Sequence, residues 1–176
     1  MTVILRPARP DEAAPLAQLG AETFSETFAH LYAPDDLQVF LDETHHADAV
    51  AERLTAGDEF WLVAEQNGAL LAYAVSGPCH LPHPEADPGQ GELKRLYVRA
   101  TAQNLGLGGR LMRQSLSWLE DRFPGPLWLG VWSENFGAQR FYQRYGFDKV
   151  GEYGFPVGQQ IDREFIFRRP APASST

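Results

Sequence analysis

The sequence predicts an α/β domain built on a mixed sheet of about seven strands, and three observations lead to this class. A short strand pattern is followed by helical periodicity. Two apolar runs then flank Gln66-Asn67-Gly68, which is typical of a β-hairpin. After the hairpin, strand and helix patterns alternate until two final strands. The 176 residues suit one domain with a sizeable core, so we expect a single domain over 1–169 and a disordered tail over 170–176.

The N-terminal part of the chain has the pattern of one strand and three helices. The strand is predicted at 3–8, VILRPA. Asp11 is a typical N-cap residue, and Leu16 and Leu19 follow it at roughly helical spacing. Gly57 stands where the third helix would end in a left-handed residue. The three helices are predicted over residues 11–24, 34–45 and 47–57.

The rest of the chain predicts six strands and two helices around one long loop. The loop, 78–91, carries four prolines, and loops of this length are often functional. The strands are predicted over residues 60–65, 69–77, 92–98, 127–132, 146–155 and 162–168. The helices are predicted over residues 109–123 and 134–145.

Composition and charge exclude several classes of protein. The net charge of −8 argues against non-specific binding to nucleic acid and is compatible with a cationic substrate. No apolar run approaches the roughly 20 residues that span a bilayer, and the N-terminus lacks a signal-peptide pattern. We therefore expect a cytoplasmic protein without a membrane segment. Cys79 is the single cysteine, which excludes an intrachain disulfide.

A glycine-rich stretch, AQNLGLG at 102–108, lies between a predicted strand and a predicted helix. It is not a Walker A loop, because Gly109 and Arg110 follow instead of Lys and Ser or Thr. It is not a dinucleotide fingerprint, because Leu111 replaces the third glycine. Unpaired N–H groups at a helix N-terminus bind anions, and glycines let an anion come close. On these residues alone, a phosphate cradle and a tight turn are equally compatible with the pattern.

Two motifs together resemble the GNAT superfamily of N-acetyltransferases. The first is Q/R-x-x-G-x-G/A at the entrance of a helix, matched by Gln103, Gly106 and Gly108. The second is N-x-x-A-x-x-F-Y-x-x-x-G-F, matched by Asn135, Ala138, Phe141, Tyr142, Gly146 and Phe147. Both lie in the expected order and separation, and the resemblance covers nearly the whole chain.

The resemblance implies a largely antiparallel twisted sheet flanked by helices, with the cofactor cleft where two central parallel strands part. It implies acetyl-CoA as cosubstrate, with its pyrophosphate held by the N–H groups of the glycine loop. Gln103, where Arg is also common, and Leu105, where many members carry Gly, Lys or Arg, depart from the pattern without removing a backbone donor. The implied cofactor-binding residues are Leu96, Tyr97, Val98, Gln103, Asn104, Leu105, Gly106, Leu107, Gly108, Gly109, Arg110 and Asn135.

The strand ELKRLYV is the expected place of the reacting groups. Alternation predicts that Glu92, Lys94, Leu96 and Val98 share one face. By resemblance, the Leu96 N–H faces the acetyl carbonyl and the Val98 backbone pairs with the pantetheine arm. Glu92 matches the general base of the histone acetyltransferase branch. The alternative for Glu92 is a solvated carboxylate or one that only attracts a cationic amine.

Tyr142 is the candidate general acid. It lies two helical turns from Asn135, so both side chains can project from one side of the helix. By resemblance its hydroxyl protonates the thiolate of coenzyme A. The alternative is an aromatic side chain in the core, beside Phe141 and Tyr145.

The segment TFSETFAHLYAPDDLQVFLDE is the candidate for binding the acceptor. It is similar to bacterial GNAT members of the spermidine/spermine acetyltransferase type. Aromatic residues and acids interleave there, as a polyamine site would require. The predicted substrate residues are Phe24, Phe28, Tyr32 and Glu26, with Glu22, Asp35 and Asp36 as further acids. The alternative is an amphipathic helix with a solvated acidic face.

Five histidines raise the question of a metal site. Cys79, His80 and His83 form C-H-x-x-H in the proline-rich loop, without an obvious fourth ligand. We expect no metal, because a closed zinc site needs four well-placed ligands.

The sequence thus predicts an N-acetyltransferase that transfers acetyl from acetyl-CoA to a primary amine of a small molecule, with a polyamine as one case. The alternatives are a protein N-terminal or lysine acetyltransferase, and a non-catalytic acyl-CoA-binding sensor. The expected partner is a small-molecule amine, without nucleic acid or membrane, and the expected state is a monomer or homodimer.

Overall fold

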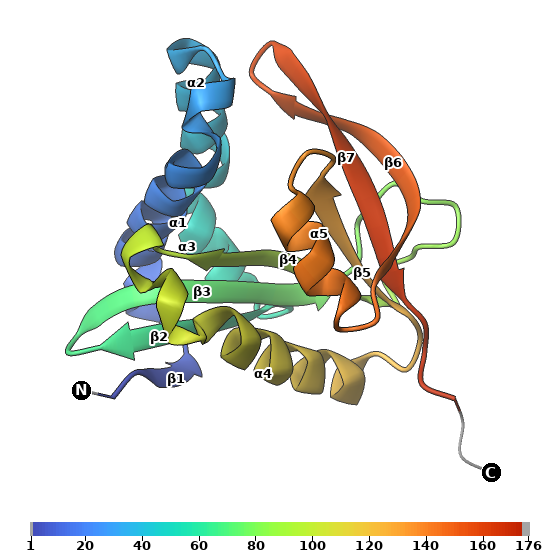
Figure 1. Ribbon diagram of the computed structural model, residues 1–176. Helices are drawn as coiled ribbons and strands as arrows, with labels where there is room; N and C mark the ends of the chain where they lie inside the picture. The colour runs from blue at the N-terminus through green and yellow to red at the C-terminus, as the bar shows by residue number, and fades with distance from the viewer. Residues whose placement is uncertain (1, 174–176) are drawn as a thin grey trace.

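The computed structural model describes residues 2–173 and contains a seven-stranded sheet in the order β1-β2-β3-β4-β5-β7-β6 (Figure 1). All neighbouring strands are antiparallel except β4 and β5, which are parallel. The predicted fold class is confirmed. The strands are β1 (Ile4–Pro7), β2 (Phe60–Gln66), β3 (Ala69–Pro78), β4 (Gly91–Val98), β5 (Leu127–Trp132), β6 (Asp148–Val157) and β7 (Gln160–Arg169). The α-helices are α1 (Ala13–Phe28), α2 (Pro34–Thr44), α3 (Ala47–Ala56), α4 (Leu107–Arg122) and α5 (Phe136–Gln143).

Helices cover both faces of the β1–β4 part of the sheet (Figure 1). Alternation along β3 explains this arrangement, because successive side chains point to opposite faces. Ala72 and Ala74 pack in the core beneath α4, together with Leu111. Tyr73 and Val75 pack in a second core beneath α1 and α3, where Leu16, Leu19 and Val50 lie. No helix within residues 2–173 is long and apolar enough to cross a membrane.

The sheet opens between β4 and β5. These strands pair only at Gly91–Leu127 and Glu92–Trp128. Beyond Trp128, β5 continues its antiparallel pairing with β7, while β4 keeps only β3 as a partner. The remainder of β4 therefore has one edge without a strand beside it.

Two features predicted from the sequence, the hairpin turn at Asn67-Gly68 and the helix end at Gly57, are confirmed. Asn67 and Gly68 both have positive φ angles, 53° and 82°, as a two-residue hairpin turn requires. Gly57 ends α3 in the left-handed conformation, with φ 76°.

The predicted start of the first helix is wrong. A 3₁₀ turn (Pro10–Glu12) precedes α1, which begins at Ala13. Glu12, rather than Asp11, organises this start, because its carboxylate accepts the Arg9 N–H at 2.7 Å and two Arg6 N–H groups at 2.8 Å each. The helix also runs four residues further than predicted, to Phe28.

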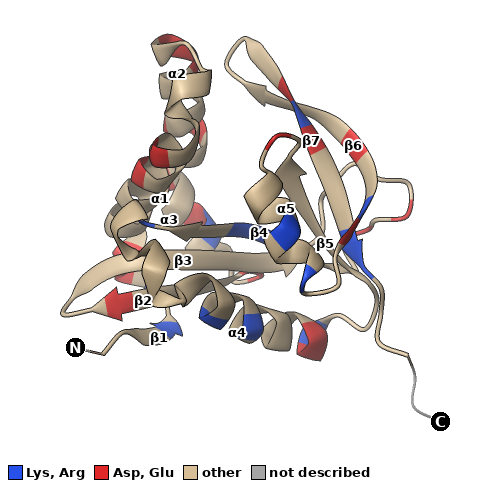
Figure 2. Cartoon of the chain, in the orientation of Figure 1, with Lys and Arg blue, Asp and Glu red and all other residues tan. Residues whose placement is uncertain are grey.

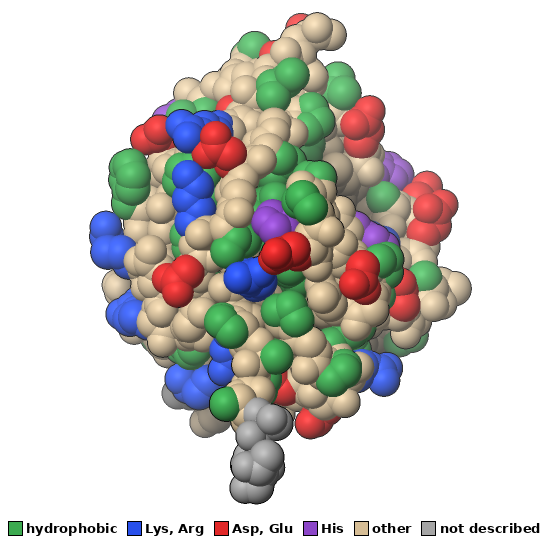
Figure 3. Space-filling model, turned by 90° about the vertical axis from the view of Figure 1, so that its right-hand side faces the viewer, with side chains coloured by type: hydrophobic (Ala, Val, Ile, Leu, Met, Phe, Trp, Pro, Cys, Tyr) green, Lys and Arg blue, Asp and Glu red, His purple; other side chains and the backbone are tan. Residues whose placement is uncertain are grey.

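Charged side chains are spread unevenly along the chain. Figure 2 shows acidic residues on α1 and α2, and Lys and Arg on α4 and α5. The face seen in Figure 3 mixes apolar, acidic and basic side chains instead of gathering one kind. After β7 the chain has no regular structure over 170–173 and is exposed there, and 174–176 of the predicted disordered tail lie outside the described residues.

Candidate active site

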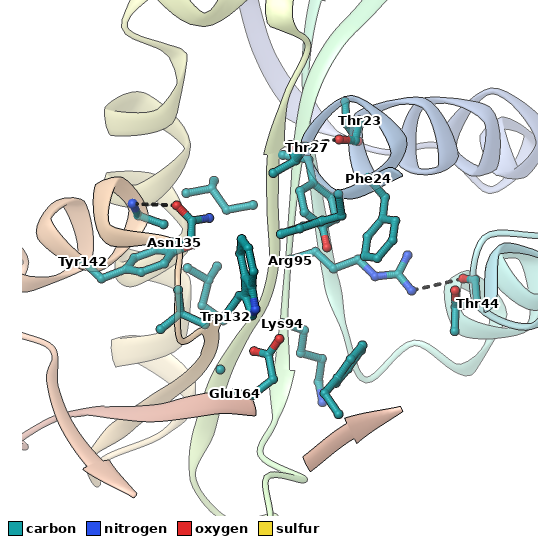
Figure 4. A pocket seen from close by; sticks show the side chains of 18 of the residues that line it. Thr23, Phe24, Thr27, Thr44, Lys94, Arg95, Trp132, Asn135, Tyr142 and Glu164 are labelled. Atoms are coloured by element: carbon teal, nitrogen blue, oxygen red, sulfur yellow. Dashed lines mark hydrogen bonds between the residues drawn. The ribbon is translucent and has the colours of Figure 1, made fainter. Parts of the chain in front are cut away.

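A cavity of about 930 Å³ lies where β4 and β5 part. Its wall combines the free edge of β4 with residues of α1, α2, α5, β5 and the β6–β7 hairpin (Figure 4). Segments far apart in the sequence therefore meet around one space, which is large enough for a ligand of substantial size.

Two residues of the glycine loop, Gln103 and Gly108, line this cavity. Gly106 has φ 71° and immediately precedes α4, so the tight turn requires glycine there. No side chain caps the start of α4, and the first intrahelical bond is from Arg110 N–H to Gly106 at 3.3 Å. The N–H groups of Leu107, Gly108 and Gly109 are therefore the unpaired donors of a first helical turn. Space is also open, because a Cβ added at Gly106 would meet nothing within 4 Å. The loop is thus a tight turn, and the phosphate cradle stays a prediction.

Half of the predicted cofactor-binding residues line the cavity. They are Leu96, Tyr97, Val98, Gln103, Gly108 and Asn135. Asn104, Leu105, Gly106, Leu107, Gly109 and Arg110 do not contribute to its wall. The Leu107 side chain is buried in the core beneath α4, so only its backbone could face a ligand. Arg110 donates to the Val3 carbonyl at 3.1 Å, which gives its side chain a packing role near the N-terminus.

Asn135 and Tyr142 reach the cavity from α5. Asn135 caps the helix, accepting the Ala138 N–H at 3.2 Å through its side-chain oxygen. Tyr142 lies above the Phe147 ring, at 6.4 Å between ring centres, and faces the cavity as well as the core. Burial and the charge of Glu164 raise its pKa to about 12. The phenol is therefore protonated at neutral pH.

The predicted common face of Glu92 and Leu96 is wrong, because β4 contains a bulge. Val75 pairs with Arg95 and Ser76 pairs with Leu93, which leaves Lys94 as an extra residue. Leu93 consequently packs in the same core as Leu96, although the two positions differ by three, an odd number that would place them on opposite faces of a regular strand.

Glu92 lies on the other face, in register with Trp128, whose ring packs in a separate core with Cys79. The Glu92 carboxylate accepts the His80 N–H at 3.0 Å and a proton of the Lys94 ammonium at 3.3 Å. It lines the cavity but is only 8% exposed. The proline-rich loop is thus held to β4 by the residue that was predicted as a base.

Glu164, on β7, is a cavity residue that sequence reasoning missed. It stands opposite Trp132 of β5, and Figure 4 shows its carboxylate in the space between Trp132 and Lys94. Within residues 2–173 this carboxylate accepts no hydrogen bond and forms no ion pair. Burial, and then the negative charge of Asp162, raises its pKa to about 8. The sequence pattern that could have identified Glu164 is the alternation of β7, because Glu164 lies two residues before the buried Ile166 and therefore on the same face.

Aromatic rings surround the part of the cavity next to Glu164. Phe24 and Phe28 share a face of α1, with their ring centres 4.9 Å apart. Phe28 meets Trp132 edge to face at 5.8 Å, and Phe40 meets Phe155 at 5.6 Å. The predicted residues Phe24, Phe28 and Tyr32 all line the cavity. We call this region the acceptor half, defined by Phe24, Phe28, Tyr32, Phe40, Trp132, Phe155 and Glu164.

The four predicted acids of the same segment do not line the cavity, which corrects the placement of Glu26. Glu26 accepts the Ala100 N–H at 2.9 Å, and Glu22 pairs with Arg99. Since Glu22 and Glu26 are four residues apart, they occupy one face of α1, and the two phenylalanines occupy another. These acids hold α1 to the segment after β4.

The acceptor half is closed by contacts between α1–α2 and the β6–β7 hairpin. The Tyr32 hydroxyl donates to the Asp162 carboxylate of β7. Asp36 of α2 accepts the Gln159 N–H, at the tip of the hairpin, at 2.9 Å. Val157 is buried beside Phe24 and Phe40. These side-chain contacts therefore join α1–α2 to the β6–β7 hairpin, the two parts of the chain that rise at the left and right of Figure 1.

His45 and Arg95 form the wall of the acceptor half near α2 and α3. His45 is 6% exposed, and its Nδ1 lies 2.7 Å from the Thr44 hydroxyl. Burial and the charges of Arg95 and Arg53 lower its pKa to about 3, so the imidazole is neutral. Arg95 donates to the Thr44 carbonyl at 3.1 Å. Within residues 2–173, no three or more His, Cys, Asp or Glu side chains are grouped to hold a metal ion.

Comparisons with known proteins bear on this site. A model of the acetyltransferase (GNAT) family matches residues 23–147. An uncharacterised N-acetyltransferase from the pepI 3′ region of Lactobacillus delbrueckii subsp. lactis is 27% identical over 151 residues, covering 86% of this chain and 87% of that protein.

Two solved structures are similar to the chain. The PaiA N-acetyltransferase of Thermoplasma acidophilum, in complex with coenzyme A, has a TM-score of 0.76 at 16% identity, covering 97% of this chain and 99% of that one. The Salmonella typhimurium protein yncA, named as an acetyltransferase and solved with its cofactor acetyl-CoA, has a TM-score of 0.73 at 18% identity, covering 100% and 98%. At these identities the two structures show a shared fold.

Proposed function

Because this chain belongs to the GNAT family of acetyltransferases, and is therefore an acetyl-CoA-dependent N-acetyltransferase, we propose that its acceptor is a primary amine of a small molecule. The observation that carries the proposal is the closed acceptor half. Tyr32 and Asp162, and Asp36 and the Gln159 N–H, join the two arms over the cavity.

The closure favours a compact acceptor over a protein. An extended peptide needs a groove that is open along its length, whereas these contacts cross the path between α1–α2 and the β6–β7 hairpin. A small amine needs only a pocket with an apolar wall and a group that recognises its charge. The rings of Phe24, Phe28 and Trp132 supply such a wall, and their faces attract cations.

A polyamine is one member of this class. A second or third ammonium group would call for further carboxylates, and Glu22, Glu26, Asp35 and Asp36 lie outside the cavity. The proposal therefore covers primary amines with an apolar body in general, and polyamines as a special case.

The residues of the cavity fit acetyl-CoA, which supplies the acetyl thioester. The unpaired N–H groups at the start of α4 suit its pyrophosphate. The free edge of β4, from Leu96 to Val98, suits a pantetheine arm that pairs like an added strand. The Tyr142 phenol is protonated and suits the role of acid toward a departing thiolate.

The test is thiol release from acetyl-CoA in the presence of a panel of acceptors. The panel contains aryl-alkylamines, alkylamines, polyamines, and peptides with a free N-terminus or an internal lysine. We expect turnover with small amines and a kcat/KM at least roughly tenfold lower with every peptide, a discrimination of about 1.4 kcal/mol. Turnover with peptides alone would overturn the proposal. Tight acetyl-CoA binding without any turnover would favour a sensor.

A further inference from the structure

We propose that Glu164 is a catalytic residue, which receives the ammonium group of the acceptor and takes its proton before acetyl transfer. The inference requires an amine acceptor but no particular size of acceptor. It therefore deepens the proposed function and would survive if the acceptor proved to be a peptide.

The position of Glu164 carries the first step of the argument. Its carboxylate lines the cavity and stands opposite Trp132, the last residue of β5. Gly130, two residues earlier, lies close beneath the same space. A Cβ added there would be tight against the Tyr153 hydroxyl, at 3.2 Å, and in ordinary contact with Glu164 Oε2, at 3.8 Å.

The second step is that the carboxylate is uncommitted. The other carboxylates near the cavity already have partners within the described chain. Glu92 binds the His80 N–H and Lys94, Asp162 binds Tyr32 and the Gln160 amide, and Glu59 binds Arg53. Glu164 binds none of these groups, so its oxygens are available to a ligand cation. Without a partner, this partly buried carboxyl group favours its neutral form, and a ligand cation would stabilise the ionised form.

The groups that face Glu164 make it a suitable proton acceptor. Asp162 on its own strand repels its charge, and burial acts in the same direction. Burial, with a smaller part from the charge of Glu164, raises the pKa of four tyrosines, Tyr32, Tyr97, Tyr142 and Tyr153. Lys94, Arg95 and Glu92 of β4 line the same cavity, and Lys94 is paired with Glu92.

Burial raises the pKa of a carboxyl group and lowers the pKa of an ammonium group. In this cavity the two values approach each other, so that proton transfer between the groups costs little.

The proton balance of the reaction uses both Glu164 and Tyr142. One proton passes from the ammonium nitrogen to the Glu164 carboxylate, which later releases it to solvent. The neutral nitrogen forms the new C–N bond at the thioester carbonyl, and the C–S bond breaks. Tyr142 gives its phenolic proton to the sulfur and regains a proton from the nitrogen. Two protons thus leave the nitrogen. One reaches solvent through Glu164, and the other restores the Tyr142 phenol, whose original proton stays on the thiol.

The experiment compares Glu164→Gln with Glu152→Gln, using the acceptor that the panel identifies. Glu152 lies on the neighbouring strand β6, is exposed, and pairs with Arg163 at 2.7 Å, so it is a matched control for loss of one carboxylate. We expect kcat/KM at pH 7.5 to fall by about 10²-fold or more in Glu164→Gln and to stay at the wild-type value in Glu152→Gln. The rise of kcat/KM through pH 8 should disappear only in Glu164→Gln.

A weakly basic acceptor amine tests whether Glu164 removes a proton or only supports the structure of the site. An amine whose nitrogen is already neutral at the assay pH needs no base, so Glu164→Gln should lose less than roughly tenfold with it. Glu164→Asp, which keeps the carboxylate, should retain the pH dependence. Acetyl-CoA binding by calorimetry checks that each variant is folded.

Two results would overturn the inference. The first is an unchanged pH profile in folded Glu164→Gln, including a case where only KM rises. The second is an equal loss with strongly and weakly basic amines.

Discussion

The phenol of Tyr142 is held in its protonated form, because burial and the charge of Glu164 raise its pKa to about 12. A group in this state can donate a proton to a departing thiolate. We predict that Tyr142→Phe lowers kcat at least roughly tenfold, while the KM for acetyl-CoA changes little. Steady-state thiol release measures both constants.

Tyr145→Phe is the matched control for this prediction. Tyr145 packs against the Phe141 ring at 5.2 Å and does not line the cavity. It should therefore keep the wild-type kcat. A wild-type rate in Tyr142→Phe would refute the acid role.

His45 links the acceptor half to the acid stability of the protein. Its pKa falls from 6.5 to about 3 on folding, because burial and two arginines disfavour the cation. Between these values the unfolded chain binds a proton that the folded chain does not, so the stability contributed by neutral His45 is present above pH 6.5 and is lost as the pH falls. We predict that wild-type protein loses up to about 1.4 kcal/mol more than His45→Asn for each pH unit below 6.5. Urea unfolding at pH 6.5 and 5.5 measures this difference.

His46→Asn serves as the control, because His46 is the adjacent histidine and its side chain is 58% exposed. It should follow the wild-type pH dependence. Equal slopes for wild type and His45→Asn would contradict the assignment of a neutral, buried imidazole.

The β6–β7 hairpin depends on a close approach at its tip. Gly158 has φ 58°, and a Cβ added there would lie 2.6 Å from the Asp36 Cα. We predict that Gly158→Ala costs more than about 1 kcal/mol of unfolding free energy and raises the KM for the acceptor, because the hairpin must move off α2. Chemical denaturation and steady-state kinetics measure the two effects, and the affinity for acetyl-CoA should stay within about twofold of wild type.

Gly68→Ala is the control that separates the strain of a positive φ angle from the steric contact between residue 158 and Asp36. Gly68 also has a positive φ, 82°, but an added Cβ would meet nothing within 4 Å. It should lose stability through strain alone and keep the acceptor KM. If both variants kept that KM, the hairpin tip would have no part in acceptor binding.

Local sequence patterns predicted most helices and strands. They failed where the pairing with a neighbouring strand determines which face a side chain occupies. The alternation of ELKRLYV predicted a common face for Glu92 and Leu96, whereas the bulge at Lys94 separates them. A bulge depends on the register with β3, and no signal within the strand itself announces it.

Glu164 escaped prediction for a similar reason. Its importance depends on β7 lying between β5 and β6, so that it faces Trp132 across a pair of strands that are not consecutive in sequence. The aromatic residues of α1 were found because their periodicity is local. The predicted placement of Glu26 in the cavity is wrong. An acidic side chain on an amphipathic helix can face solvent, bind a ligand or accept a neighbouring backbone N–H, and Glu26 accepts the Ala100 N–H.

The whole molecule joins its N-terminal and C-terminal segments over the acceptor half. Tyr32 and Asp162 are 130 residues apart in sequence, and their hydrogen bond ties α1–α2 to β7. We predict that Tyr32→Phe increases amide exchange at the hairpin tip, around Gln159, by roughly tenfold, which corresponds to about 1.4 kcal/mol of local opening energy. Hydrogen exchange followed by mass spectrometry measures this.

The amides of the β2–β3 hairpin in the same sample are the internal reference, because they lie outside the closed region. Their exchange should not change. Uniform acceleration across the chain would mean global destabilisation instead of a looser closure. An unchanged tip would mean that the Asp36 contact alone holds it.

Two residue pairs between β4 and β5 are the whole of the seam that makes one sheet out of two half-sheets. A seam this short could act as a hinge, and it lies beside the cavity. A donor molecule lying along the free edge of β4 would splint the hinge and stiffen the floor on which the acceptor must rest. We therefore expect the donor to bind before the acceptor.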